Sequence, residues 1–71
     1  MFLLTREREA RGWSRNELSR RARMAAGDVG RIEAGRLRPY DSQLKKLARA
    51  LQWPIDDAPR LLDAVESEQV Q

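Results

Sequence analysis

The side chains of this 71-residue chain that could make strong directed contacts are mainly arginines, and some of them lie in the stretch ARMAAGDVGRIEAG. Arg31 can offer a planar fork of hydrogen-bond donors to a pair of acceptors, and Asp28, three residues earlier, can accept hydrogen bonds. Next to them stand Ala26, which has only a methyl side chain, and Gly27, which has none, so the backbone there is accessible to a partner. These residue types suit recognition of a partner better than bond-making chemistry.

Several residue types needed for catalysis are missing. The sequence contains no histidine and no cysteine, so the commonest general base, the commonest metal ligand and any thiolate are absent from it. No pair of acids, nucleophile beside a base or phosphate-cradling glycine loop is recognisable. We therefore predict no enzymatic activity, no metal site and no cofactor.

Charge is distributed unevenly along the chain. Residues 1–50 carry 13 of the 14 Lys and Arg residues, whereas residues 51–71 carry one Arg and 5 of the 11 acidic residues. A basic body with an acidic end suits a polyanionic partner, although a solvated helix surface of Arg and Glu would give the same balance. Of the 14 cations, 12 are Arg, which fits forked phosphate contacts but equally fits the codon bias of a GC-rich genome.

Helical spacing and helix stop signals recur, and no segment alternates as a strand would. Five helices are expected, at about residues 3–11, 14–23, 26–34, 42–51 and 56–65. Their apolar positions predict one core, formed by Leu4, Leu18, Ala22, Ala25, Val29, Ile32, Leu44, Leu47, Ala48 and Leu51. We expect a single all-α domain over residues 1–66, with residues 67–71 as a frayed tail.

Two helices have informative starts. Ser14 and Glu17 have the spacing of a capping box, in which each side chain bonds the other residue's backbone N–H. In the helix expected at 26–34, Gly27 and Gly30 each cost about 1 kcal/mol relative to Ala. Tertiary packing must therefore hold that helix in place.

The second and third helices are separated by only three residues, 23–25, and so short a turn forces them to cross steeply. This is the arrangement of a helix-turn-helix, in which the first helix crosses the phosphate backbone and the second enters the major groove of DNA.

Residues 4–58 resemble the five-helix, lambda-repressor-like DNA-binding domain of the Cro/C1-type phage repressors, also called the XRE family. The similar stretches cover about three quarters of the chain and read REARGWSRNELS, VGRIEAG, RLRP and LKKLARALQWPIDD. Six residues have a combined spacing that is specific, although none is specific alone: Leu18, Ile32, Glu33, Gly35, Pro39 and Leu51.

The resemblance implies that bases are contacted from Ala26, Gly27, Asp28 and Arg31. Ala26 can meet a thymine methyl group, and Gly27 offers only its backbone. Asp28 can accept from a cytosine amino group or can simply support the start of its helix. Only Arg31 can make a two-point contact to guanine, which contributes about 1–3 kcal/mol of discrimination.

The same resemblance implies phosphate contacts from Arg15, Arg36, Arg38 and, more weakly, Lys45. For Arg36 and Arg38, which follow the third helix, the alternative is a solvated loop with no role in binding.

Arg8 and Glu33 match positions that pair in the family, where they join the first helix to the end of the third. Two separate surface charges are the alternative.

The function expected is that of a transcriptional regulator, a repressor, that binds double-stranded DNA as a homodimer in the cytoplasm. Leu61, Leu62 and Val65 are the candidate dimer face, with packing onto the domain's own core as the alternative. No apolar run approaches the roughly 20 residues that span a bilayer, so no membrane partner is expected. The alternative function is a protein-interaction module or antitoxin-type partner of another protein, built on the same fold.

Overall fold

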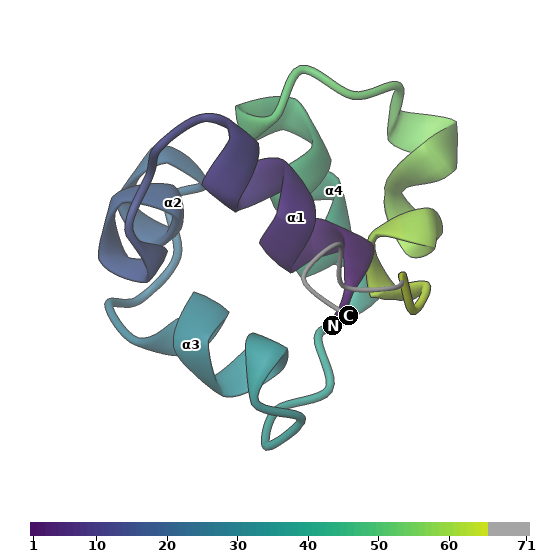
Figure 1. Ribbon diagram of the computed structural model, residues 1–71. Helices are drawn as coiled ribbons and strands as arrows, with labels where there is room; N and C mark the ends of the chain where they lie inside the picture. The colour runs from purple at the N-terminus through teal and green to yellow at the C-terminus, as the bar shows by residue number, and fades with distance from the viewer. Residues whose placement is uncertain (66–71) are drawn as a thin grey trace.

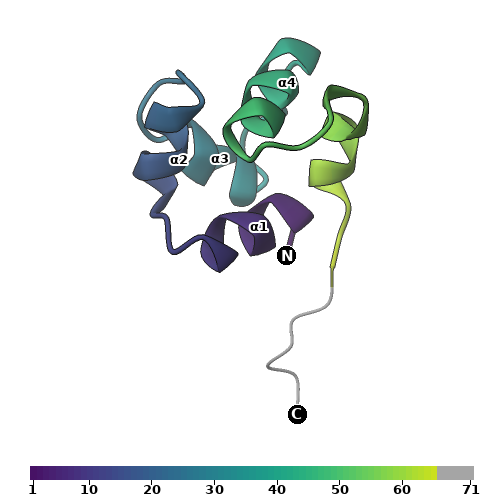
Figure 2. The same ribbon diagram turned by 90° about the horizontal axis from the view of Figure 1, so that it is seen from above.

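The computed structural model describes residues 1–65, in which five helical elements surround one core. They are α1 (Leu3–Ala10), α2 (Arg15–Arg21), α3 (Asp28–Glu33), α4 (Asp41–Ala50) and the 3-10 helix η1 (Ile55–Leu62). Figure 1 shows α1 in the middle of the molecule, with α2 and η1 on its two sides. Seen from above in Figure 2, α4 lies across from α1, between α2 and η1. The predicted all-α class is confirmed.

The buried apolar residues come from every element. They are Leu4, Leu18, Ala22, Val29, Ile32, Leu44, Leu47, Ala48, Leu51, Ala58 and Leu61. The core prediction is wrong at Ala25, which is exposed. The reason is that α3 begins at Asp28, so Ala25 lies in the preceding turn and does not share the helix's inward face with Val29 and Ile32.

The start of α2 has only half of the expected capping box. The Ser14 hydroxyl accepts a hydrogen bond from the Glu17 backbone N–H at 3.0 Å. The Glu17 carboxylate does not return that contact, because it accepts hydrogen bonds from the Arg20 and Arg21 side chains instead. The Arg21 guanidinium also lies 4.4 Å from the ring centroid of Trp13, which packs partly buried against the core.

The turn between α2 and α3 is longer than the three residues predicted, because α2 ends at Arg21 and α3 begins at Asp28. Arg23 and Gly27 both have left-handed backbone conformations in it, with φ of 59° and 90°. Gly27 is the N-cap of α3 and not a residue of its interior. The predicted destabilisation relative to alanine, which applies inside a helix, is therefore wrong at Gly27. At this φ, glycine is the residue that avoids strain.

Residues 55–62 form a 3-10 helix where an α-helix was expected. The element begins at Ile55, so Pro59 stands inside it. A proline there has no N–H to donate, and its ring crowds the preceding turn, which disfavours an α-helix. Leu61 is fully buried in the domain's own core, so the expectation that it contributes to a dimer face is wrong.

Both ends of the described chain lie side by side. A single antiparallel β-bridge joins Phe2 to Ala64, with the Leu3 N–H donating to the Asp63 carbonyl at 2.8 Å. The predicted domain boundary after residue 66 and the tail at 67–71 lie outside the described residues. Among residues 1–65, no helix has both the length and the apolar character needed to cross a membrane.

Candidate nucleic-acid interface

One side of α3 faces the core and the other faces outward. Val29 and Ile32 are buried, and because successive helical residues are 100° apart, the opposite side carries Gly27, Gly30, Arg31 and Ala34. Arg31 and Ala34 are exposed, and the two glycines are half-buried. The outward side of α3 thus presents an almost bare backbone with a single long side chain.

Arg31 folds back along this bare surface. Its Nη1 donates a hydrogen bond to Oδ1 of Asp28 at 3.0 Å, although its side chain stays 59% exposed. A Cβ atom added to Gly27 would lie 3.7 Å from three atoms of the Arg31 guanidinium, so the guanidinium lies flat over this glycine. Asp28, itself a predicted base contact, therefore orients Arg31 within the same turn of helix.

The carboxylate of Glu33 joins three helices. Arg8 on α1 reaches its two oxygens with Nε–Oε2 and Nη2–Oε1 distances of 2.8 and 3.1 Å. Arg15 at the start of α2 adds a hydrogen bond from Nε to Oε1 at 3.1 Å. The side chains of Arg8 and Glu33 are only 8% and 4% exposed, whereas that of Arg15 is 60% exposed. Arg8 and Glu33, which the sequence predicted to pair, are thus in contact. Arg15 also binds this carboxylate, which the sequence did not indicate.

Arg15 and Arg36 lie around one hollow. This hollow, of about 480 Å³, is lined by Met1, Thr5, Arg15, Gly30, Glu33, Ala34 and Arg36. Arg36 is exposed, and its backbone N–H donates to the Arg31 carbonyl at 2.8 Å, which closes the end of α3. Two predicted phosphate contacts are therefore brought together beside the predicted reading helix.

The other two predicted phosphate contacts lie apart from this group. Arg38 lines a second hollow, of about 360 Å³, that also includes Phe2, Ile32, Leu37 and Leu62. Lys45 lies on α4, where its Nζ pairs with Oδ2 of Asp41 at 3.2 Å.

Ala26 is exposed and borders a third hollow, of about 410 Å³, with Ser14, Asn16, Glu17, Arg20 and Met24. This hollow runs from the start of α2 to the turn before α3, and Ala26 is the one predicted base contact that borders it. The Glu17 carboxylate lies in it but is neutralised by Arg20 and Arg21.

Ser19 is a positioning residue that the sequence reading missed. It is fully buried on α2, and its hydroxyl accepts a hydrogen bond from the Val29 backbone N–H at 3.3 Å. Its position on the helical wheel beside Leu18 and Ala22 could have indicated it, because a buried hydroxyl needs a partner.

Two consecutive helices that pack on one another, the second with an open outer side flanked by arginines, define a helix-turn-helix. A family model described as a helix-turn-helix domain, of the Cro/C1 (XRE) type, matches residues 2–61, and the chain belongs to this family. The resemblance stated from the sequence is thereby confirmed. Comparisons with curated proteins and with solved structures found no match.

Proposed function

We propose that this chain is a DNA-binding transcriptional regulator that places the outer side of α3 in the major groove of duplex DNA. Membership of a helix-turn-helix family supports DNA binding in general. The observation that carries the specific proposal is the gathering of Arg15, Arg31 and Arg36 around the bare side of α3.

The charges around α3 suit a phosphate backbone. Glu33 is 4% exposed and Asp28 is 16% exposed, and each is paired with arginine. Arg31, Arg15 and Arg36 remain exposed, so the surface that a duplex would meet is positive. Arg36 can bind a phosphate while Arg31 reaches a base edge.

We also propose that the regulator is a repressor and works as a homodimer on a two-fold site. A single helix-turn-helix module buries little surface on DNA, and two copies spaced one helical turn apart give useful affinity. With Leu61 inside the core, the candidate dimer face is reduced to the half-buried Leu62 and Val65.

Titration of the protein into a labelled random duplex of about 25 base pairs, followed by fluorescence anisotropy, tests DNA binding. The expected result is binding at about 50 mM salt that weakens by orders of magnitude at about 200 mM, since phosphate contacts release counterions. Sedimentation of the complex tests the dimer. A protein that stays unbound to duplex at low salt would refute the proposal.

A protein-interaction module is the second candidate, and one observation favours it. The hollow lined by Phe2, Leu37 and Leu62 presents apolar side chains at the surface beside Arg38. Such a surface suits a partner chain better than a phosphate backbone. The low-salt titration separates the two functions, because this hollow contains none of the three arginines, Arg15, Arg31 and Arg36, on which DNA binding would depend.

A further inference from the structure

Arg15 extends across α3 and does not point away from it. Its Cδ lies so near Gly30 that a Cβ atom added to this glycine would come within 3.3 Å of it. Its Nε is held by Oε1 of Glu33 at 3.1 Å. An arginine from α2 thus lies along the outer side of α3, at a position where α3 itself has no side chain.

The hydrogen bond to Glu33 uses only part of the Arg15 donor set. A guanidinium has five N–H donors, and the one on Nε is engaged, so the two Nη groups can form a two-point contact. Two neighbouring acceptors at this spacing are found on the major-groove edge of guanine, which presents O6 and N7, and also on a phosphate.

We propose that Arg15 is a second base-reading side chain that recognises a guanine, with Gly30 as the space it occupies and Glu33 as the residue that positions it. The inference rests on the proposed DNA-binding function and adds a guanine to the one expected for Arg31. Each arginine then lies against a glycine of the α3 surface, Arg31 against Gly27 and Arg15 against Gly30.

A guanine edge fits this geometry better than a phosphate does. Among the described residues the Arg36 side chain has no ion pair or hydrogen bond, so no side chain orients it, and it suits attraction to a phosphate, which depends mainly on charge. Arg15 differs because Glu33, itself anchored by Arg8, holds its Nε against α3. A guanidinium that is already oriented loses less rotational freedom when it makes a directional contact.

The test uses the duplex that the wild-type protein selects from a random pool, with each guanine replaced in turn by 7-deazaguanine, which lacks N7. For the wild-type protein, replacement at each guanine that an arginine reads should weaken binding by about 5-fold or more. In Arg15→Ala, replacement at one of these guanines should no longer matter, while the others keep their effect.

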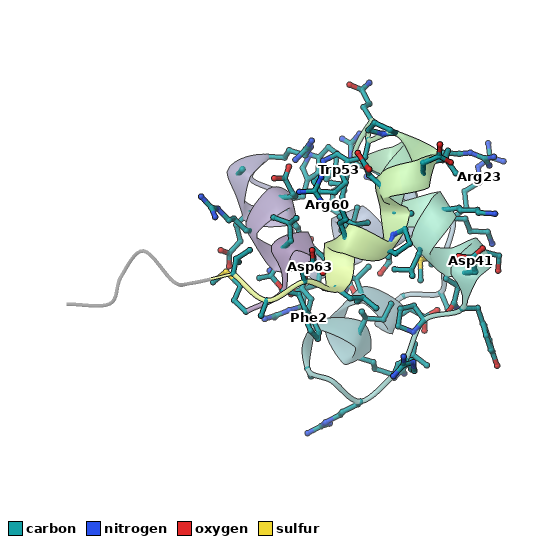
Figure 3. All side chains as sticks on the ribbon, turned by 90° about the vertical axis from the view of Figure 1, so that its right-hand side faces the viewer. Phe2, Arg23, Asp41, Trp53, Arg60 and Asp63 are labelled. Atoms are coloured by element: carbon teal, nitrogen blue, oxygen red, sulfur yellow. The ribbon has the colours of Figure 1, made fainter. Side chains whose placement is uncertain are left out.

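Arg60→Ala is the matched control, because it removes the same charge from η1, on the opposite side of α1 from α2 (Figures 1 and 2). Arg60 projects from η1 near Trp53, as Figure 3 shows, and the variant should keep every guanine's effect. If Arg15→Ala instead weakens binding to all probes by one common factor and keeps each guanine's effect, Arg15 is a phosphate contact and the proposal is wrong.

Glu33→Gln tests the positioning role at a temperature where circular dichroism shows the variant folded. Sensitivity to the Arg15-dependent guanine should fall, although Arg15 is still present, and sensitivity to the others should remain. Full sensitivity at that guanine would contradict the role given to Glu33. A pool that yields no preferred sequence, or a protein that binds no duplex, would instead refute the DNA-reading function itself.

Discussion

The guanidinium of Arg8 grips the carboxylate of Glu33 at two points, across 25 residues of sequence. A third Arg8 hydrogen bond, from Nη1 to the Trp13 carbonyl at 2.8 Å, ties the chain just before α2 to the same side chain. Because these contacts are partly buried, they set the position of α3 relative to α1 and α2. The side that α3 turns outward therefore depends on residues that never meet a partner.

Glu33→Ala is expected to destabilise the domain by about 3–5 kcal/mol, since it leaves Arg8 charged and nearly buried without its partner. A domain of this size has a total stability on the order of 5 kcal/mol, so the variant should be largely unfolded at room temperature. Urea denaturation followed by circular dichroism measures the change. Glu9→Ala, an exposed acid on α1 only 3.7 Å from the same guanidinium, is the control and should cost about 0.5 kcal/mol or less. A similar small loss for Glu33→Ala would show that the buried pair contributes little.

The two glycines of the α3 surface should respond oppositely to alanine. Gly30 is inside the helix, where alanine is favoured by about 0.5–1 kcal/mol, and the added Cβ meets only the flexible Arg15 side chain, at 3.3 Å. Gly27 has φ of 90°, where alanine is strained by about 1–2 kcal/mol. Thermal denaturation should therefore show Gly30→Ala stabilised and Gly27→Ala destabilised. Equal shifts would mean that the cap conformation at Gly27 is not formed.

Arg23 has a left-handed backbone conformation, with φ of 59°, in which its Cβ atom causes strain that glycine would avoid. Arg23→Gly should raise the free energy of unfolding by about 0.5–1 kcal/mol, because relief of strain exceeds the added freedom of the unfolded chain. Arg20→Gly, a change of the same type within α2, should lower it by about 1 kcal/mol. Chemical denaturation measures the free energy of unfolding of both variants. A loss of stability in Arg23→Gly would contradict the left-handed conformation of Arg23 in the turn.

Glu17 should make the stability of the domain depend on pH in acid. The hydrogen bond from the Arg20 side chain is the largest cause that lowers the pKa of Glu17, and Arg21 adds to it, while burial opposes both. Because this pKa is lower in the folded than in the unfolded state, its stabilisation is complete above the unfolded pKa and is lost as pH falls through the folded pKa. The difference in unfolding free energy between the wild type and Glu17→Gln should therefore shrink from about pH 6 to about pH 3. A difference that stays constant would show that these side chains do not interact with Glu17.

The sequence indicated the parts of the fold that rest on apolar spacing. Leu44, Leu47 and Leu51 follow the helical period, and all three are buried. Local signals also located the start of α2, because Ser14 accepts from Glu17 as a cap should. Burial along a helix depends on period alone, so one sequence suffices to find it.

What the sequence did not indicate depends on contacts between helices or on backbone conformation. The reach of Arg15 from α2 to Glu33 on α3 follows from how closely the two helices pack, which no spacing along the chain encodes. Gly27 gave an ordinary helical pattern, and only its positive φ distinguishes a cap from an interior residue. The Glu17 side chain could pair with two arginines or with its own N-cap, and the arginines prevail.

Selection of bound sequences from random duplex DNA, repeated with Arg31→Ala and Arg36→Ala, tests the central claim most directly. We predict a defined sequence for the wild type and loss of preference at one base pair for Arg31→Ala. Arg36→Ala should keep the same sequence preference and bind every sequence more weakly. The salt dependence of Arg36→Ala should also have a slope smaller by about one. No enriched sequence for the wild type, or the same loss for both variants on selected and random DNA, would contradict the claim that Arg31 on α3 reads a base while Arg36 binds a phosphate.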